Sequence, residues 1–400
     1  MKTIYLSIHN IIITSLILIA GLIASSCGSD EPAPDPEPTR TVIVYMVANN
    51  NLGTNGYDRL DIEEMRSVAS SIPDGSHLVV YHAGRRKSPE LKEITAAADV
   101  TLKTYEGGYT DGLSLTPARM KEVFADVERL APADSYGLVL WSHGTGWVET
   151  DESRSGTDIL TVTDTRVSTL SFGNDNGFEM NVTSLSEALQ GRKFDFLYFD
   201  CCLMGSVEVA YQLRDAAPYI VASPTELQVY GMRYDRNIPV FFSKEPDMVQ
   251  AAKNTFSYYN DGTDGVARAC SMCVIDTKEM KGLADATRAI MATGALPSAT
   301  YKPVTFYNRY RNAIADMTDY ITSLPGVDES LIAAWREAFG KAVIYSAATP
   351  AYGSYDLSRF GGLACAALMS ADDVYYKGYD NQAWFDDVVS HNKSLFVVAD

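Results

Sequence analysis

Two cysteines stand side by side at the end of an apolar run, Cys201 and Cys202 in FDFLYFDCCLMGSVEV. A thiolate is a strong nucleophile, and neighbouring side chains of a strand point to opposite faces, so only one of the two should face a cleft. We expect the next helix to begin near Leu203 or Met204, where its partial positive charge would favour a thiolate. Cys202 lies nearer that helix and is therefore the candidate nucleophile.

A candidate partner ends a second strand, in WSHGTGW. His143 is followed at once by Gly144, and glycine lets the backbone approach a ligand closely. A lone histidine at a strand end can equally be structural, as can His82 in YHAG. Cys202 favours the functional interpretation of His143, because a histidine beside a thiol can act as proton acceptor or as imidazolium partner.

The order of apolar runs and helical patterns predicts an α/β fold, with a mostly parallel sheet flanked by helices on both faces. The expected strands are 41–47, 77–82, 100–105, 136–141, 194–200 and 219–223. The expected helices are 57–71, 117–130, 183–190 and 204–215, the second with Thr116 as N-cap and Pro117 as its first residue. Residues 49–56, NNNLGTNG, are expected to form a polar loop. In such sheets a ligand site lies beyond the carboxyl ends of the strands, so His143 and Cys202 should share one end.

The two loops together resemble those of the clostripain-type cysteine peptidases (family C11, clan CD), relatives of caspases, gingipains and legumain. The resemblance rests on WSHGTGW, on FDCCLMGSVEVAYQL and on YIVASPTE, and it covers about 41–235 well and the remainder loosely. It implies a caspase-like fold in which Cys202 is the nucleophile and Cys201 a buried filler. His143 would donate a proton to the leaving amine, and the N–H groups of Gly144 and Cys202 would form the oxyanion hole. The dyad needs no third member in this family, and none is assigned.

The resemblance also implies cleavage after Arg or Lys, with Asp200 and a second aspartate in the pocket. At the position of the second aspartate this chain has Tyr230, which is uncharged at neutral pH. Glu226 could take the place of the missing aspartate. Asp200 could instead cap the next helix. The first strand and its loop, VIVYMVANNNL, resemble those of the family with Asn49 where aspartate is usual.

Family members mature by self-cleavage between the histidine and the cysteine, and Arg154 and Arg166 are the candidate sites. Some relatives need calcium, for which this loop offers acidic oxygen ligands, although no spacing specifies a metal site. A catalytically inactive surface lipoprotein of the same fold, binding peptide or protein, is the alternative function that the loss of aspartate at Tyr230 leaves open.

The N-terminal segment predicts export. Residues 1–26 combine Lys2 with an apolar stretch too short for a comfortable membrane span, which is typical of a cleaved signal peptide. ASSC resembles a bacterial lipobox, so Cys27 would carry a lipid, with ordinary secretion as the alternative. The acidic, proline-rich tether at 27–40 resembles the surface-export signal of Bacteroidetes lipoproteins. We therefore predict an outer-membrane lipoprotein, exposed at the cell surface and held to the membrane only by its anchor.

Beyond the tether we expect a catalytic domain at 41–242 and a mainly helical subdomain at 243–400. The net charge of −18 and the lack of a Lys/Arg cluster argue against nucleic acid as a partner. The family resemblance implies a protein or peptide substrate. Besides Cys27 the chain has five cysteines at irregular spacing, which form no disulfide framework. Cys270 and Cys273 of CSMC lie in an expected strand and should point to opposite faces as core residues.

Overall fold

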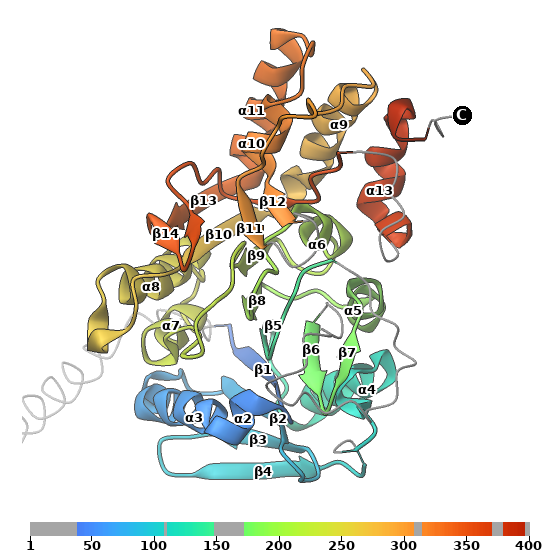
Figure 1. Ribbon diagram of the computed structural model, residues 1–400. Coiled ribbons are helices and arrows are strands. Elements are labelled where there is room, and N and C mark those ends of the chain that lie inside the picture. The colour runs from blue at the N-terminus through green and yellow to red at the C-terminus, as the bar shows by residue number, and fades with distance from the viewer. Residues whose placement is uncertain (1–37, 108–109, 148–171, 308–313, 370–378, 397–400) are drawn as a thin grey trace, which may run out of the picture. The chain divides into compact units, whose positions relative to one another are not determined.

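A mixed sheet organises the protein (Figure 1). The computed structural model describes residues 38–107, 110–147, 172–307, 314–369 and 379–396, so the predicted signal peptide, Cys27, Arg154 and Arg166 lie outside the described residues. Within them, nine strands pair in the order β13-β10-β9-β8-β5-β1-β2-β3-β4. Their bounds are β1 Arg40–Ala48, β2 His77–Gly84, β3 Glu90–Ile94, β4 Asp99–Thr104, β5 Ser135–Trp141, β8 Leu197–Asp200, β9 Tyr219–Ala222, β10 Ser271–Asp276 and β13 Val343–Ala348.

The centre of the sheet is parallel, as the sequence predicts. β1 pairs in parallel with β2 and β5, β5 with β8, and β8 with β9. Residues 41–48 of β1 are all buried, as a β-branched run covered on both faces must be. The edges are antiparallel, with β3 and β4 on one side and β10 and β13 on the other. The predicted parallel sheet is therefore its central part, and residues 243–400 add two strands to it as well as helices.

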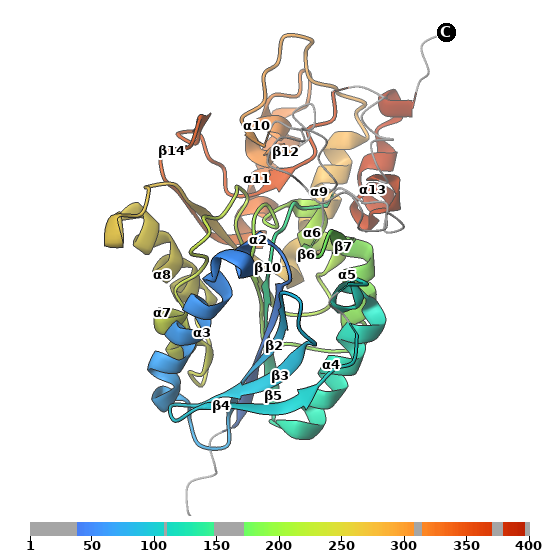
Figure 2. The same cartoon turned by 60° about the horizontal axis from the view of Figure 1, so that its bottom comes forward.

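Helices cover both faces of the sheet. In Figure 2, α3, α7 and α8 lie on one side of it, and α4, α5 and α6 on the other. The helices are α2 Asn51–Asn55, α3 Tyr57–Val68, α4 Pro117–Leu130, α5 Val182–Leu189, α6 Val207–Gln212, α7 Tyr234–Phe241, α8 Met248–Asn260, α9 Met280–Met291, α10 Met317–Thr322, α11 Glu329–Ala342 and α13 Ala383–Asp387. The 3-10 turns are Ala69–Ser71, Leu113–Leu115, Thr263–Gly265, Thr277–Glu279, Tyr379–Asn381, Val389–His391 and Lys393–Phe396.

Small sheets complete the described part of the chain. β11 Thr305–Tyr307, β12 Ile314–Asp316 and β16 Ala364–Cys365 form one of them. β6 Phe172–Asp175 pairs with β7 Phe178–Met180, and β14 Ala351–Tyr352 with β15 Tyr355–Asp356. No helix of the described residues has both the length and the apolar composition that crossing a bilayer requires.

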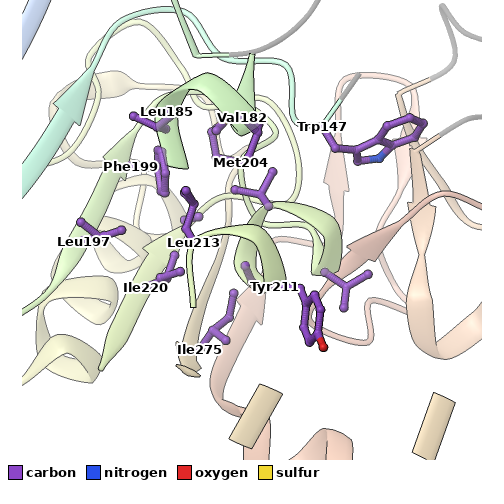
Figure 3. Packing of buried hydrophobic residues seen from close by; sticks show 14 of the residues in the cluster. Trp147, Val182, Leu185, Leu197, Phe199, Met204, Tyr211, Leu213, Ile220 and Ile275 are labelled. Carbon is purple, nitrogen blue, oxygen red and sulfur yellow. The ribbon is translucent and has the colours of Figure 1, made fainter. Parts of the chain in front are cut away.

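Two hydrophobic clusters lie on the two faces of the sheet. Figure 3 shows part of one of them, where Leu185 of α5 and Met204 pack near Phe199 of β8. Cys273 belongs to this cluster and Cys270 to the other, which confirms that these two cysteines are core residues on opposite faces. Cys202 packs against both clusters, because it lies where the strand ends between them.

Local capping sets where the helices begin. Thr116 accepts from the N–H of Arg119 (3.3 Å) and Pro117 opens α4, as predicted. Two expectations were wrong. The helix after Cys202 begins only at Val207, because Leu203 has a positive φ of 62° and the side chain of Ser206 caps the helix. The expected loop at 49–56 contains the short helix α2, capped by Asn50.

Candidate active site

The ends of adjacent parallel strands bring His143 and Cys202 to one end of the sheet. Trp141 of β5 pairs with Asp200 of β8, and His143 and Cys202 each lie two residues beyond this pair. Side chains two residues apart on a strand point to the same face, so the register places the two loops at equivalent positions. This agrees with the sequence-based expectation for a site beyond the carboxyl ends of the strands.

Gly144 is the point where the two loops touch. A β-carbon on Gly144 would lie 2.6 Å from the carbonyl oxygen of Cys202 and 2.8 Å from Cβ of Cys201. A side chain here would therefore push the histidine loop away from the cysteine loop. The glycine that the sequence places after His143 is required by this close approach of two backbones.

The two cysteines differ as expected. Cys201 is buried, belongs to the core on the α4 side, and donates its S–H to the carbonyl of Leu140 (3.1 Å). Cys202 is partly exposed, and its Sγ lies 3.4 Å from the carbonyl oxygen of Leu227 and 3.3 Å from the Leu227 amide nitrogen. Cys202 is thus the more accessible of the two thiols, and it contacts Leu227 in the segment after β9.

The thiol of Cys202 is neutral in this conformation. Burial raises the pKa of Cys202 to about 12, and the negative charges of Glu226 and Asp200 act in the same direction. This contradicts the expected thiolate at a helix N-terminus, because α6 starts too far along the chain for its dipole to act within the first turn. Burial also lowers the pKa of His143, so both groups of the candidate dyad favour their neutral forms.

His143 has a partner that the sequence did not indicate. Its Nε2 lies 2.6 Å from Oδ1 of Asn51, at the start of α2. No hydrogen bond joins His143 directly to Cys202 among the described residues, since the thiol contacts Leu227 instead. The position of Asn51 just after β1, next to β5 in the sheet, was the available signal, but the assumption of a polar loop concealed it.

The neighbouring asparagines hold the histidine loop. Asn50 donates to the hydroxyl of Ser142 (3.3 Å) and to the carbonyl of Asn174 (2.8 Å). Asn49, at the position where the resemblance implies aspartate, donates to the buried carboxylate of Asp175 (2.7 Å). The loops after β1 and β5 are therefore joined to β6 by side-chain hydrogen bonds.

Asp200 lies beneath the cysteines and is enclosed. It is 4% exposed and accepts from the N–H of Met232 (2.8 Å) and the hydroxyl of Tyr234 (3.1 Å). A β-carbon on Gly231 would meet both of its oxygens, at 2.6 and 2.7 Å. Asp200 therefore caps no part of α6, and in this conformation backbone covers it. Burial raises the pKa of Asp200 to about 7.

A second buried acid lies close to Asp200. The indole N–H of Trp141 donates to Asp61 of α3 (2.6 Å), and Asp61 is 3% exposed. Burial first, and then the charge of Asp200, raise the pKa of Asp61 well above its usual value. Asp61 could not be singled out from the sequence, because it is one of several acids on an amphipathic helix.

The other predicted pocket residues lie on the segment that contacts Cys202. Glu226 is half-buried and next to Leu227, whereas Tyr230 is 44% exposed. The ring of Tyr230 packs edge-on against Tyr57 at the start of α3, with centroids 5.8 Å apart. Within the described residues, no group of three His, Cys, Asp or Glu side chains is arranged to hold a metal ion. The acids that could supply oxygen ligands to calcium, Asp151, Glu152 and Asp164, lie outside these residues.

The comparisons with known proteins agree with this architecture. The model of the clostripain family matches residues 44–392. Clostripain of Hathewaya histolytica is 26% identical over 228 residues, which are 49% of this chain and 41% of that protein. This chain thus aligns with less than half the length of the curated relative.

Two solved structures share most of the fold. An inactive zymogen C11 protease from Parabacteroides distasonis is 28% identical, with a TM-score of 0.72 over 88% of this chain and 99% of that chain. A secreted C11 cysteine protease from Bacteroides thetaiotaomicron, in complex with an irreversible peptide inhibitor, is also 28% identical, with a TM-score of 0.69 and the same coverage.

A large mixed sheet covered by helices, with the histidine and cysteine loops in contact at the carboxyl ends of its parallel strands, defines a protein of the caspase-like fold class. Within that class, the chain belongs to the clostripain family.

Proposed function

We propose that this protein is a cysteine endopeptidase that uses a dyad of Cys202 and His143. The observation that carries the proposal is the contact of Gly144 with the backbone of Cys202, which brings the two motifs together at the end of the sheet where α/β proteins bind ligands. Membership of the clostripain family supports the same chemistry.

The reaction is acyl transfer. Sγ of Cys202 attacks the scissile carbonyl carbon, and the thiol proton passes to the imidazole of His143 as the S–C bond forms. The imidazolium then protonates the leaving amine while the C–N bond breaks. Water then attacks the thioester carbonyl while His143 takes its proton. The S–C bond breaks, the carboxylic acid product leaves, and His143 returns the proton to Sγ of Cys202. The N–H groups of Gly144 and Cys202 stabilise the oxyanion.

Because Cys202 is a neutral thiol against Leu227, substrate must displace this contact before attack. The N–H and the carbonyl of Leu227, which both contact Sγ of Cys202, are the groups that an extended peptide needs for backbone pairing. A substrate that binds this segment would therefore also release the nucleophile.

We propose cleavage after Arg or Lys. The carboxylates of Asp200 and Glu226 support it, since both raise the pKa of Cys202 and so act near the nucleophile. An approaching cation would have to move the cover that Gly231, Met232 and Tyr234 form over Asp200.

The test compares wild type, Cys202→Ala and Cys201→Ala, each without the predicted signal peptide. Each protein is assayed on peptides with Arg, Lys, Ala, Asp or Asn before the scissile bond, with and without calcium. Loss of activity only in Cys202→Ala supports the proposal, and the preferred residue identifies the pocket. Cys201→Ala keeps activity, since Cys201 is a core residue.

The second candidate function is an inactive peptide-binding or protein-binding protein of the same fold. The neutral, hydrogen-bonded thiol of Cys202 and the covered carboxylate of Asp200 favour it. It replaces the first if no peptide is cut and if Cys202→Ala binds peptides as wild type does.

We further propose that Cys27 carries a lipid anchor at the outer membrane and that the chain cleaves itself after Arg154 or Arg166. The N-terminal sequence supports the anchor, and the family resemblance supports the cleavage. Incorporation of radiolabelled palmitate into wild type but not into Cys27→Ala tests the first. Mass spectrometry of wild type and of the Arg154→Ala and Arg166→Ala variants tests the second.

A further inference from the structure

The contact between His143 and Asn51 defines the protonation of the imidazole. An amide oxygen can only accept, so a neutral ring that hydrogen-bonds to Oδ1 of Asn51 through Nε2, 2.6 Å away, has its proton on Nε2 and leaves Nδ1 to accept another. We propose that Asn51 is a positioning residue of the dyad, which holds His143 in this tautomer and orientation so that Nδ1 receives the thiol proton of Cys202. This inference rests on the proposed peptidase function and names a third member for its dyad.

The backbone of Asn51 is firmly placed. It is the first residue of α2, and the side chain of Asn50 caps this helix by accepting from the N–H of Leu52 (2.9 Å). A β-carbon on Gly53 would lie only 1.9 Å from the carbonyl oxygen of Ala48, so α2 packs directly on the end of β1. The short helix therefore acts as a fixed mount for the Asn51 amide.

The loop of His143 is mounted on the neighbouring strand. The carbonyl of His143 accepts from the N–H of Gly173 (2.8 Å), and the hydroxyl of the preceding residue, Ser142, donates to the carbonyl of Val47 (2.8 Å). Since β1 and β5 are paired in register, both ends of the contact between Asn51 and His143 are held by one rigid part of the sheet. A hydrogen bond between two backbone segments that are both held in place can orient an imidazole, whereas one between two freely moving loops could not.

The acceptor is neutral, which has an electrostatic consequence. Burial lowers the pKa of His143, and an amide does not counteract this as a carboxylate would. Asn51 therefore orients the ring while leaving it neutral until the thiol proton arrives. The charged groups on the elements around the contact have other partners, namely Asp58 with His82, Asp175 with Asn49, Glu179 with Asn174, Arg85 with Thr54, and Asp200 with Met232 and Tyr234.

The kinetic test uses Asn51→Ala and Asn51→Asp, with Asn55→Ala and Asn55→Asp as matched controls. Asn55 is exposed on the same helix and makes no side-chain hydrogen bond to the described residues. We expect Asn51→Ala to lower kcat by about 10-fold to 100-fold with little change in KM, because the ring is misoriented. Asn51→Asp, which keeps the acceptor, should recover most of this loss.

The pH profile separates positioning from a merely structural role. A carboxylate at residue 51 would stabilise the imidazolium, so the limb of the kcat/KM profile that follows His143 should move up by about one pH unit or more in Asn51→Asp. Asn55→Asp adds the same charge to the same helix and should leave that limb in place. The inference is overturned if Asn51→Ala cleaves as wild type does, or if both aspartate variants give the same profile.

A measurement without turnover tests the same inference. In ¹⁵N-histidine spectra of Cys202→Ala, assigned by loss of a signal in His143→Gln, His143 should be the Nε2–H tautomer. Adding Asn51→Ala should shift it toward a mixture of tautomers. The inference is contradicted if His143 is the Nδ1–H tautomer, or if its tautomer is the same with and without the Asn51→Ala substitution. A wild type that cleaves nothing but shows the Asn51-dependent tautomer contradicts the peptidase function alone.

Discussion

Gly144 and Cys202 are in backbone contact, so close that a β-carbon on Gly144 would lie 2.6 Å from the carbonyl oxygen of Cys202. The separation of the two loops is therefore set by the absence of a side chain. Because reactive groups must be placed within a fraction of an ångström, we expect this glycine to set the spacing of the two loops in addition to donating its N–H to the oxyanion.

We expect Gly144→Ala to lower kcat by about 100-fold, because the methyl group separates the histidine and cysteine loops. Steady-state kinetics on the preferred peptide measures this. The matched control is Gly282→Ala in α9, where an added β-carbon meets nothing within 4 Å and should stabilise the helix by about 1 kcal/mol. Unchanged kcat in Gly144→Ala would show that the loops can separate without harm.

The hydrogen bond from Asn49 to Asp175 makes aspartate unfavourable at residue 49. Asn49→Asp would set two buried carboxylates against each other, so we expect it to lower the free energy of unfolding by about 2–3 kcal/mol at pH 8. Since burial raises the pKa of Asp175 to about 6, the loss should be smaller at pH 5.

The reversed pair, Asn49→Asp with Asp175→Asn, restores a donor and an acceptor. Urea denaturation of the two single variants and the double variant gives the coupling free energy. We expect the double variant to regain most of the stability that Asn49→Asp loses. Additive losses would mean that the two side chains do not interact.

The stability of the protein should depend on Asp200 over a defined pH range. Burial raises the pKa of Asp200 to about 7, so the folded state holds its proton where the unfolded state, with a pKa of about 4, has lost it. The contribution is complete below the unfolded pKa and is lost as pH rises to about 7. We expect wild type to lose stability relative to Asp200→Asn by at most about 1.4 kcal/mol per pH unit in this range.

Melting temperatures of wild type and Asp200→Asn between pH 4 and 8 check this expectation. Asparagine keeps an acceptor for Met232 and can pair with the hydroxyl of Tyr234, so the variant should fold. Parallel curves for the two proteins would show that folding leaves the pKa of Asp200 unchanged.

Alkylation of Cys202 should be slow in the substrate-free protein. A pKa of about 12 and the contact with Leu227 predict a rate with iodoacetamide at pH 7 about 100-fold below that of a free cysteine. Cys201, only 3% exposed, should react more slowly still. A peptide substrate should speed the reaction of Cys202 by displacing Leu227. Rapid labelling without peptide, followed by mass spectrometry, would contradict this picture.

The sequence predicted the central sheet and the shared end of its strands because apolar β-branched runs and capped helices are local signals. Thr116 and Pro117 marked the start of α4 to the residue. Cys202 and His143 could be paired because parallel strands leave their carboxyl ends together. These inferences need only the type and spacing of residues.

The rest depends on contacts between distant segments. The antiparallel edge strands β10 and β13 follow from pairing across more than 50 residues, which no local period encodes. Residues 49–56 contain glycine and polar residues that favour loops, and α2 forms where the cap from Asn50 acts together with the packing of Gly53 against Ala48. For the same reason neither Asn51 nor Leu227 could be assigned to the site.

The run Asn49–Asn51 looks like a repeat of one letter, yet its members cannot be exchanged. Asn49 donates a hydrogen bond to Asp175, and Asn51 is hydrogen-bonded to His143. Asn50 caps α2 and donates a hydrogen bond to Ser142. Deleting a single asparagine would leave the composition almost unchanged and still shift all these contacts by one position. The segment should therefore tolerate neither shortening nor lengthening. Among related proteins that differ from this one by small insertions or deletions, few should have such a change at residues 49–51.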